Sequence, residues 1–210
     1  MKKFSGLGLV VVLLVALVAL PAMAKIDKAP VGKGSSEVSA NLALANTTFS
    51  SDESDATFGM NSFTLGLGYG YFLTNAIQLG VFGSYSMSQM VDNDPNTEEQ
   101  DPSSQFFYQG RAAYNFQLKN SPAILPFVAL KLGGATFISG DPNADPIQAV
   151  SYGMGAGLRY FLSRQASLNA EFDYDAMSAE VDAGGGDTIT FTIATTQVWV
   201  GLSVFLGGAK

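Results

Sequence analysis

Apolar residues alternate with small or polar residues along most of this chain, with a period of two. The alternation is clearest where glycines separate Leu65, Leu67 and Tyr69. The segments that follow the pattern are 37–49, 64–71, 77–82, 105–116, 125–137, 151–160, 168–175 and 189–206. A period of two is that of a β-strand, and no helical pattern separates these segments. The sequence therefore predicts an all-β domain of eight strands.

The connections between these strands alternate in length. Short ones lie at 73–76, 117–124 and 161–166. Longer ones, rich in Asp, Ser, Asn and Gly, lie near 50–58, 89–104, 138–147 and 176–188. Short turns at one end and long loops at the other are typical of outer-membrane barrels, in which the short turns are periplasmic. We therefore expect residues 36–210 to form an eight-stranded antiparallel transmembrane β-barrel with up-and-down topology.

Alternation alone leaves open which face of the sheet points outward. A soluble lipocalin-type carrier would keep its apolar face inside. The polar face here is mostly Gly, Ala, Ser and Asn, which fits the narrow lumen of an eight-stranded barrel. Only 14% of the chain is charged, too little for a soluble exterior. Aromatic residues near the short turns predict a ring at the membrane interface; these are Tyr69, Tyr71, Tyr114, Phe116 and Tyr160.

The N-terminus carries the features of an export signal. Two lysines precede an apolar run over 7–20, and Ala-Met-Ala at 22–24 forms a small-x-small cleavage site. The run is shorter than the roughly 20 residues of a membrane-spanning helix, although a retained anchor is the alternative. We expect residues 1–24 to be a cleaved signal peptide and 25–35 a flexible periplasmic lead-in to the barrel.

Composition argues against several classes of function. The chain has no cysteine, which removes disulfides and thiolate metal sites, and no histidine, the usual base of outer-membrane barrel enzymes. We therefore expect no enzyme and no cofactor, with a carboxylate-only mechanism as the alternative. Without Lys2 and Lys3, nine basic residues remain against 18 acidic ones, a net charge of −9. Such a chain is not expected to bind nucleic acid, whose phosphates need clustered Lys and Arg.

Strand parity places three acidic and three basic residues on the inward face. They are Glu37, Arg111, Lys131, Arg159, Glu171 and Asp173. Charges in a narrow barrel must pair or stay hydrated, and Arg159 and Glu171 flank a short turn, so we expect a diagonal pair between them. One interpretation is a salt-bridged core that plugs the lumen. The other is a gate in which the charges re-pair and open a narrow ion path.

The four longer connections contain thirteen acidic residues and no Lys or Arg. A solvated surface is one interpretation, and binding of divalent cations, or their bridging to lipopolysaccharide or a surface partner, is the other. The weak metal candidates Asp92, Asp94 and Asn96 match the start of a calcium loop. Thr97 and Ser103 stand where that loop needs Gly and Glu, so an EF-hand is not expected.

The chain resembles the small outer-membrane β-barrel family typified by OmpA and OmpX. The likeness lies in Gly66–Gly80, Pro126–Gly133, Gly153–Leu162 and Ser167–Tyr174. The resemblance implies a location in the outer membrane of a Gram-negative cell, in contact with lipid and lipopolysaccharide. The family's C-terminal signal for the barrel assembly machinery is matched by Gly201, Val204 and Leu206, although residues 207–210 extend past it.

We therefore expect a monomeric, non-enzymatic barrel with a structural or surface-interaction role in the cell envelope. The alternative is a narrow porin-like channel for ions or small solutes, gated by salt bridges in the lumen. A soluble periplasmic carrier is a third possibility, which requires the apolar face to point inward.

Overall fold

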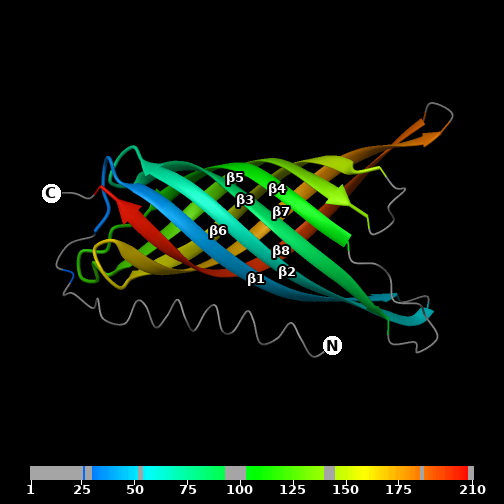
Figure 1. Ribbon diagram of the computed structural model, residues 1–210, viewed down its shortest axis with the longest axis horizontal. Helices are drawn as coiled ribbons and strands as arrows, with labels where there is room; N and C mark the ends of the chain where they lie inside the picture. The colour runs from blue at the N-terminus through cyan, green and yellow to red at the C-terminus, as the bar shows by residue number, and fades with distance from the viewer. Residues whose placement is uncertain are drawn as a thin grey trace.

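The computed structural model is a closed antiparallel barrel in which every strand pairs with its neighbours in sequence (Figure 1). It describes residues 26, 30–51, 54–92, 103–139, 145–184 and 187–207. The strands are β1 (Ser36–Ser51), β2 (Ser54–Phe72), β3 (Ile77–Asp92), β4 (Ser103–Asn115), β5 (Ile124–Ile138), β6 (Ile147–Phe161), β7 (Ala166–Gly184) and β8 (Asp187–Leu206). Pairing of β1 with β8, from Ser36↔Leu206 to Ala43↔Trp199, closes the cylinder. The predicted eight-stranded antiparallel barrel is confirmed.

The apolar face of the sheet points outward. Along β5, Leu130 and Leu132 are 66% and 67% exposed, whereas Lys131 between them is 6% exposed. Leu67 and Leu158 are likewise exposed on their own strands. An apolar outer surface of this extent is suited to hydrocarbon and not to water. The apolar-in arrangement required by a soluble carrier is therefore wrong. Among the described residues, no helix has the length and hydropathy needed to cross a membrane.

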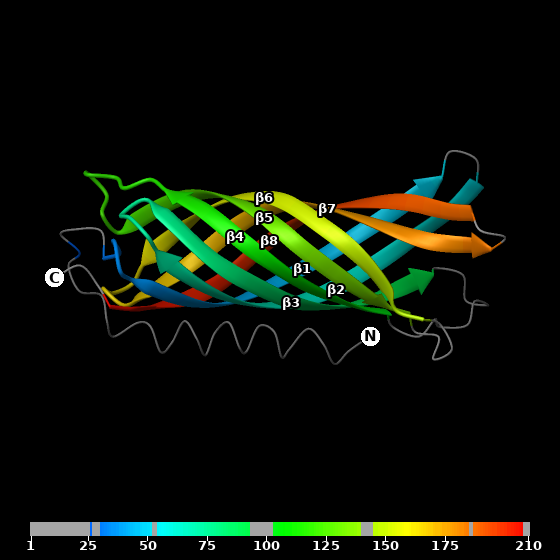
Figure 2. The ribbon, with the colours of Figure 1, turned by 90° about the horizontal axis from the view of Figure 1, so that it is seen from above.

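The two ends of the barrel differ. One end, here called the turn end, carries the connections 73–76, 116–123 and 162–165. At the other, here called the hairpin end, the β1–β2 and β7–β8 pairs project past the rest of the barrel (Figures 1 and 2).

The loops predicted at 50–58 and 176–188 are mostly strand. β1 runs to Ser51 and β2 begins at Ser54, while β7 runs to Gly184 and β8 begins at Asp187. Backbone pairing continues along these hairpins, for example at Phe49↔Phe58. Ladder hydrogen bonds need no apolar side chains, so pairing continues where the apolar alternation in the sequence fades. The longer connections at this end reduce to 93–102 and 139–146.

An apolar layer closes the lumen at the turn end. It consists of Val31, Phe72, Leu125, Phe161 and Phe205, each at most 2% exposed. The lead-in is held beneath the strands by hydrogen bonds, from Gly34 N to Phe72 O at 2.9 Å and from Phe72 N to Ser35 O at 2.9 Å. The expectation of a flexible lead-in is therefore wrong for residues 30–35. The strands end in inward-facing phenylalanines, and Val31 buries against them.

Candidate functional site

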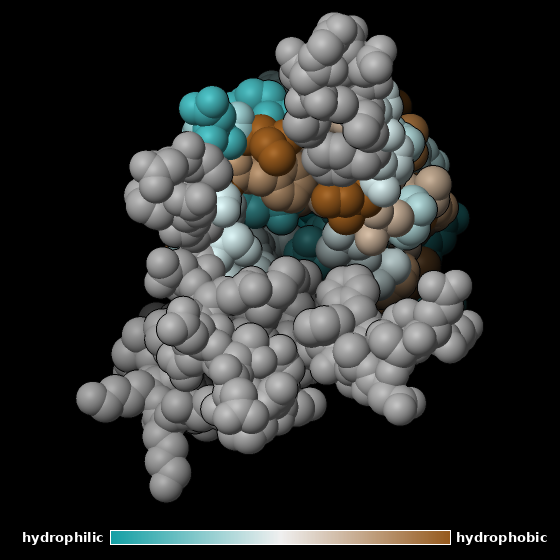
Figure 3. All heavy atoms as spheres, turned by 90° about the vertical axis from the view of Figure 1, so that its right-hand side faces the viewer, coloured by the Kyte–Doolittle hydropathy of each residue, from teal (hydrophilic) through white to brown (hydrophobic). Residues whose placement is uncertain are grey.

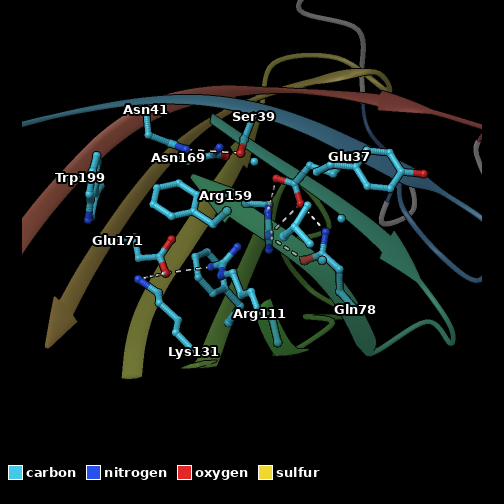
Figure 4. A pocket seen from close by; sticks show the side chains of 18 of the residues that line it. Glu37, Ser39, Asn41, Gln78, Arg111, Lys131, Arg159, Asn169, Glu171 and Trp199 are labelled. Atoms are coloured by element: carbon cyan, nitrogen blue, oxygen red, sulfur yellow. Dashed lines mark hydrogen bonds and ion pairs between the residues drawn. The ribbon is translucent and has the colours of Figure 1, made fainter. Parts of the chain in front are cut away.

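The six charged residues assigned to the lumen by parity line a single cavity inside the barrel (Figure 4). The cavity has a volume of about 30 Å³, and one water needs roughly 10–15 Å³ on this measure, so there is space for about two water molecules. Seen from the hairpin end, a recess lies beside the described atoms, and hydrophilic side chains are visible within it (Figure 3). The charges form two clusters at different depths.

The Arg159 cluster lies nearer the turn end and is held by a bidentate ion pair. Arg159 Nε donates to Glu37 Oε1 at 3.0 Å, and Arg159 Nη2 lies 2.9 Å from Glu37 Oε2. Arg159 Nη1 donates to Asn115 Oδ1 at 2.6 Å. Glu37 also accepts hydrogen bonds from Gln78 Nε2 and Ser203 Oγ, each at 2.5 Å. Both charged side chains are at most 5% exposed, and every polar atom of the pair has a partner, as a stable buried ion pair requires.

The predicted diagonal pair between Arg159 and Glu171 is wrong. In the β6–β7 register Arg159 lies opposite Asn169, and Glu171 lies opposite Gly157. The guanidinium extends instead across the lumen to β1. In so narrow a barrel, a long side chain can reach strands on the opposite wall. The order of the strands in the sequence predicts contacts between neighbouring strands only.

The Lys131 cluster lies deeper toward the hairpin end and is less completely bonded. Arg111 Nη2 lies 2.8 Å from Glu171 Oε1, and Lys131 Nζ lies 3.7 Å from the same oxygen. Lys131 also pairs directly with Asp173. Arg111 Nε and Asp173 Oδ1 are buried and have no hydrogen-bond partner, and the same holds for Gln197 Oε1 and Trp199 Nε1 on β8. Buried polar atoms are normally satisfied, so these atoms mark the part of the lumen that can hydrate or re-pair.

Aromatic rings separate and support the two clusters. The guanidinium carbons of Arg111 and Arg159 lie 4.9 and 4.3 Å from the ring centre of Phe127. Lys131 Nζ lies 5.7 Å from the ring centre of Phe82, which in turn meets Trp199 edge-on at 5.4 Å. Cations over aromatic faces are attracted by the ring quadrupole, most strongly when desolvated, as here. These contacts add a favourable interaction to each of the three basic side chains.

Glycines on β6 make room for the acids of β7. Gly153 pairs with Asp175 and Gly155 with Asp173. A Cβ at Gly155 would collide with Asp173 Oδ1 and lie 2.7 Å from Glu171 Oε1. A Cβ at Gly153 would collide with Asp175 Oδ1. The bare backbone of β6 therefore lets the acids cross it and reach β4 and β5.

Sequence reasoning missed Asp175, a fourth acid in the lumen. The residue is 6% exposed and accepts a hydrogen bond from Gln109 Nε2 at 3.2 Å, which also donates to Ser151 Oγ at 3.2 Å. No described basic side chain forms an ion pair with it. Its parity matches that of Asp173, so the alternation could have found it. The uncharged partners Gln78, Asn115 and Ser203 carry no such signal, because small polar residues fill much of the inward face.

The other predicted site residues lie elsewhere. Tyr69, Tyr71, Tyr114, Phe116 and Tyr160 lie near the turn end and are between 40% and 49% exposed on the outer surface. The metal candidates Asp94 and Asn96 lie outside the described residues, as does the side chain of Asp92. Within the described part of the chain, no group of three or more His, Cys, Asp or Glu could hold a metal ion.

Comparison with known proteins identifies relatives of this fold. Residues 10–204 match the family described as outer membrane protein beta-barrel domain. The crystal structure of the outer membrane protein OprG from Pseudomonas aeruginosa is similar, with 14% identity, a TM-score of 0.55, and coverage of 87% of this chain and 99% of that one. Neisserial surface protein A has 17% identity and a TM-score of 0.54, with coverage of 82% and 99%. At these identities the likeness concerns the fold alone. No curated protein matches the sequence at a significant level.

Proposed function

Because the chain belongs to the outer membrane protein beta-barrel domain family and lies in the outer membrane of a Gram-negative cell, we propose that it is a non-enzymatic barrel with a structural or surface-interaction role in the envelope. In this proposal the turn end is periplasmic and the hairpin end extracellular, as is typical of such barrels. Residues 1–24 serve as the export signal.

The observation that carries the proposal is the filled lumen. The Arg159 cluster spans the barrel with every polar atom of its ion pair bonded, and the apolar layer around Val31 and Phe72 lies below it. An ion crossing this region would have to separate a buried pair and enter an apolar layer, both of which are unfavourable. A plugged lumen supports a structural role over conduction.

The absence of histidine supports a non-enzymatic role, because histidine is the side chain whose ordinary pKa lies near the working pH and the usual general base of barrel enzymes. In the described lumen, three of the four acids form ion pairs with basic side chains. Acids held in this way are poorly placed to accept a proton from a substrate.

The acidic hairpin end supports a surface role. Lipopolysaccharide is anionic. The four longer connections contain thirteen acids and no Lys or Arg, so they would repel it unless cations lie between them. We therefore include divalent cations among the proposed partners, as bridges to lipopolysaccharide or to a surface ligand.

The C-terminal strand supports assembly by the barrel machinery. Val204 and Leu206 are 50% and 57% exposed on the outer surface, in the alternate positions that the family's signal uses. Gly201 has the opposite parity and faces the lumen, where a Cβ would collide with Asn41 Oδ1. A monomer is the proposed state, because the barrel closes within a single chain.

A narrow channel is the second candidate, and the Lys131 cluster favours it. Its unbonded atoms and the adjacent cavity would allow Arg111 and Lys131 to exchange partners.

Conductance of the purified full chain in a planar bilayer tests both candidates. A structural barrel is expected to give no steady openings, either as the native protein or as Glu171→Ala, since the apolar layer remains in both. Steady openings of the native protein that change in Glu171→Ala would contradict the structural proposal and establish transport. Heat-modified gel mobility verifies folding of each sample.

A further inference from the structure

Among the residues that the structure describes, basic and acidic residues outside the lumen are segregated to opposite ends of the barrel. Lys33, Lys119 and Arg164 are exposed, and they lie in three separate segments at the turn end. None of the described residues in the lead-in or in the turns 73–76, 116–123 and 162–165 is acidic. The hairpin end has the opposite composition, with its thirteen acids and no base. The described part of the turn end therefore has a local positive charge, on a chain whose net charge is negative.

Exposed apolar side chains accompany these bases. Leu118 is 41% exposed next to Lys119, and Phe116 is 43% exposed in the same turn. In the turn 73–76, Leu73 is 44% exposed. Side chains of both kinds together are suited to the boundary between hydrocarbon and headgroups, where the apolar part is buried and the charged part stays hydrated.

We propose that the turn end binds the headgroups of anionic phospholipids in the leaflet that surrounds it. Lys33, Lys119 and Arg164 would contact the lipid phosphates, and Leu73, Phe116 and Leu118 would enter the acyl boundary. Juxtamembrane bases are attracted to an anionic leaflet, and the attraction falls off within a Debye length. A hydrated anionic polymer would also attract the bases, but it would leave these apolar side chains in water. The inference requires only the membrane location and not the proposed envelope role.

Lipid selectivity of the full chain tests the inference. The protein is folded into vesicles of phosphatidylcholine with a minor fraction of phosphatidylglycerol, extracted mildly, and its retained lipid is counted by mass spectrometry. We expect phosphatidylglycerol to be enriched about threefold or more over the vesicle composition at low salt. Each base near an anionic surface favours binding by a severalfold change in the equilibrium constant. High salt should reduce the enrichment, because it screens exposed charges.

Two matched variants separate charge from fold. The neutral triple variant Lys33→Gln, Lys119→Gln, Arg164→Gln should return the retained lipid to the vesicle composition. The charge-conserving variant Lys33→Arg, Lys119→Arg, Arg164→Lys should keep the enrichment. Heat-modified mobility verifies that both variants form the barrel; all three bases are exposed, so folding is expected to survive.

The inference is overturned if the native protein shows no enrichment, or if the neutral variant retains it. Sedimentation of the native protein with purified peptidoglycan, in the absence of lipid selectivity, would also overturn it, because the partner of the bases would then be an anionic polymer.

Discussion

The pair between Arg159 and Glu37 joins strands that are far apart in the chain, β6 and β1. Its two charges are desolvated, so each depends on the other for compensation. The surrounding amide and hydroxyl groups add hydrogen bonds but no charge. Loss of either member would leave a buried charge with neutral partners only.

Glu37→Ala is therefore expected to lower the free energy of unfolding by about 3–5 kcal/mol, the usual effect of breaking a buried ion pair. The measurement is the midpoint of urea unfolding, followed by heat-modified mobility. Arg164→Ala is the control, because that arginine is exposed in a turn near Arg159. Equal midpoints for Glu37→Ala and the native protein would show that the lumen is hydrated enough to tolerate a lone arginine.

The four lumenal acids should differ in their contributions to stability. Asp173→Asn removes the charge opposite Lys131 and is expected to destabilise the barrel by about 3 kcal/mol. Asp175→Asn removes a buried acid that has no basic partner among the described residues, and it keeps an acceptor for Gln109, so stability should stay equal or rise. Urea midpoints of the two variants, which make the same chemical change two residues apart, check the difference. A larger loss for Asp175→Asn would indicate a bound cation there.

Strand parity placed charged residues inside the barrel, because a period of two fixes the facing direction of each side chain. It could not identify their partners. Glu37 meets Arg159, and Arg111 meets Glu171, across the lumen and not along the sheet. Such contacts depend on the stagger of all eight strands, which the sequence of one strand does not encode.

At the scale of the element, the glycines of β6 matter because their missing side chains leave space for the acids of β7. Gly155→Ala would place a Cβ against Asp173 and Glu171, which should push both acids away from Lys131. Overpacking of this kind is expected to lower the free energy of unfolding by about 1–3 kcal/mol. Ala156→Val is the matched control, since Ala156 is exposed on the outer face. Urea unfolding of both variants measures the effect. An equal loss of unfolding free energy in the two would show that its cause is the backbone of β6 and not the contact with the acids.

The lead-in offers a second test at this scale. Val31→Asp would place a charge in the apolar layer beside Phe72 and Phe161, so residues 30–35 should detach. Lys33 is exposed within that segment, and its detachment should speed tryptic cleavage after Lys33 by an order of magnitude or more. Val31→Ile, which keeps the apolar contact, should retain the native rate. Unchanged cleavage in Val31→Asp would mean that the backbone hydrogen bonds alone hold the segment.

Elements were predictable where the membrane imposes a pattern and less so elsewhere. The turns 73–76 and 161–166 agree with the structure to within one residue at each end, because an apolar alternation stops there. The strands of the β1–β2 and β7–β8 hairpins continue past the apolar pattern, so the sequence predicts strands that are shorter than those observed. Burial of Val31 was missed because a single valine in a short polar segment gives no periodic signal.

At the scale of the whole molecule, closure depends on the contact between the first and last strands. Within the described residues, the pairing of β1 with β8 runs from Ser36↔Leu206 to Ala43↔Trp199, and both strands continue beyond this seam toward the hairpin end. Trp199 is the only tryptophan of the chain, and it is 4% exposed against Phe82 of β3. Its fluorescence therefore reports on closure at the last paired position of the seam.

Unfolding should move the emission of Trp199 to longer wavelength, since water replaces the ring of Phe82. We expect this transition to coincide with the loss of heat-modified mobility in urea, because the lumen clusters join non-adjacent strands and should make the barrel a single cooperative unit. In Glu37→Ala both transitions should move together to lower urea. A fluorescence change that precedes the mobility change would contradict cooperativity and show that the seam opens while the remaining strands stay paired.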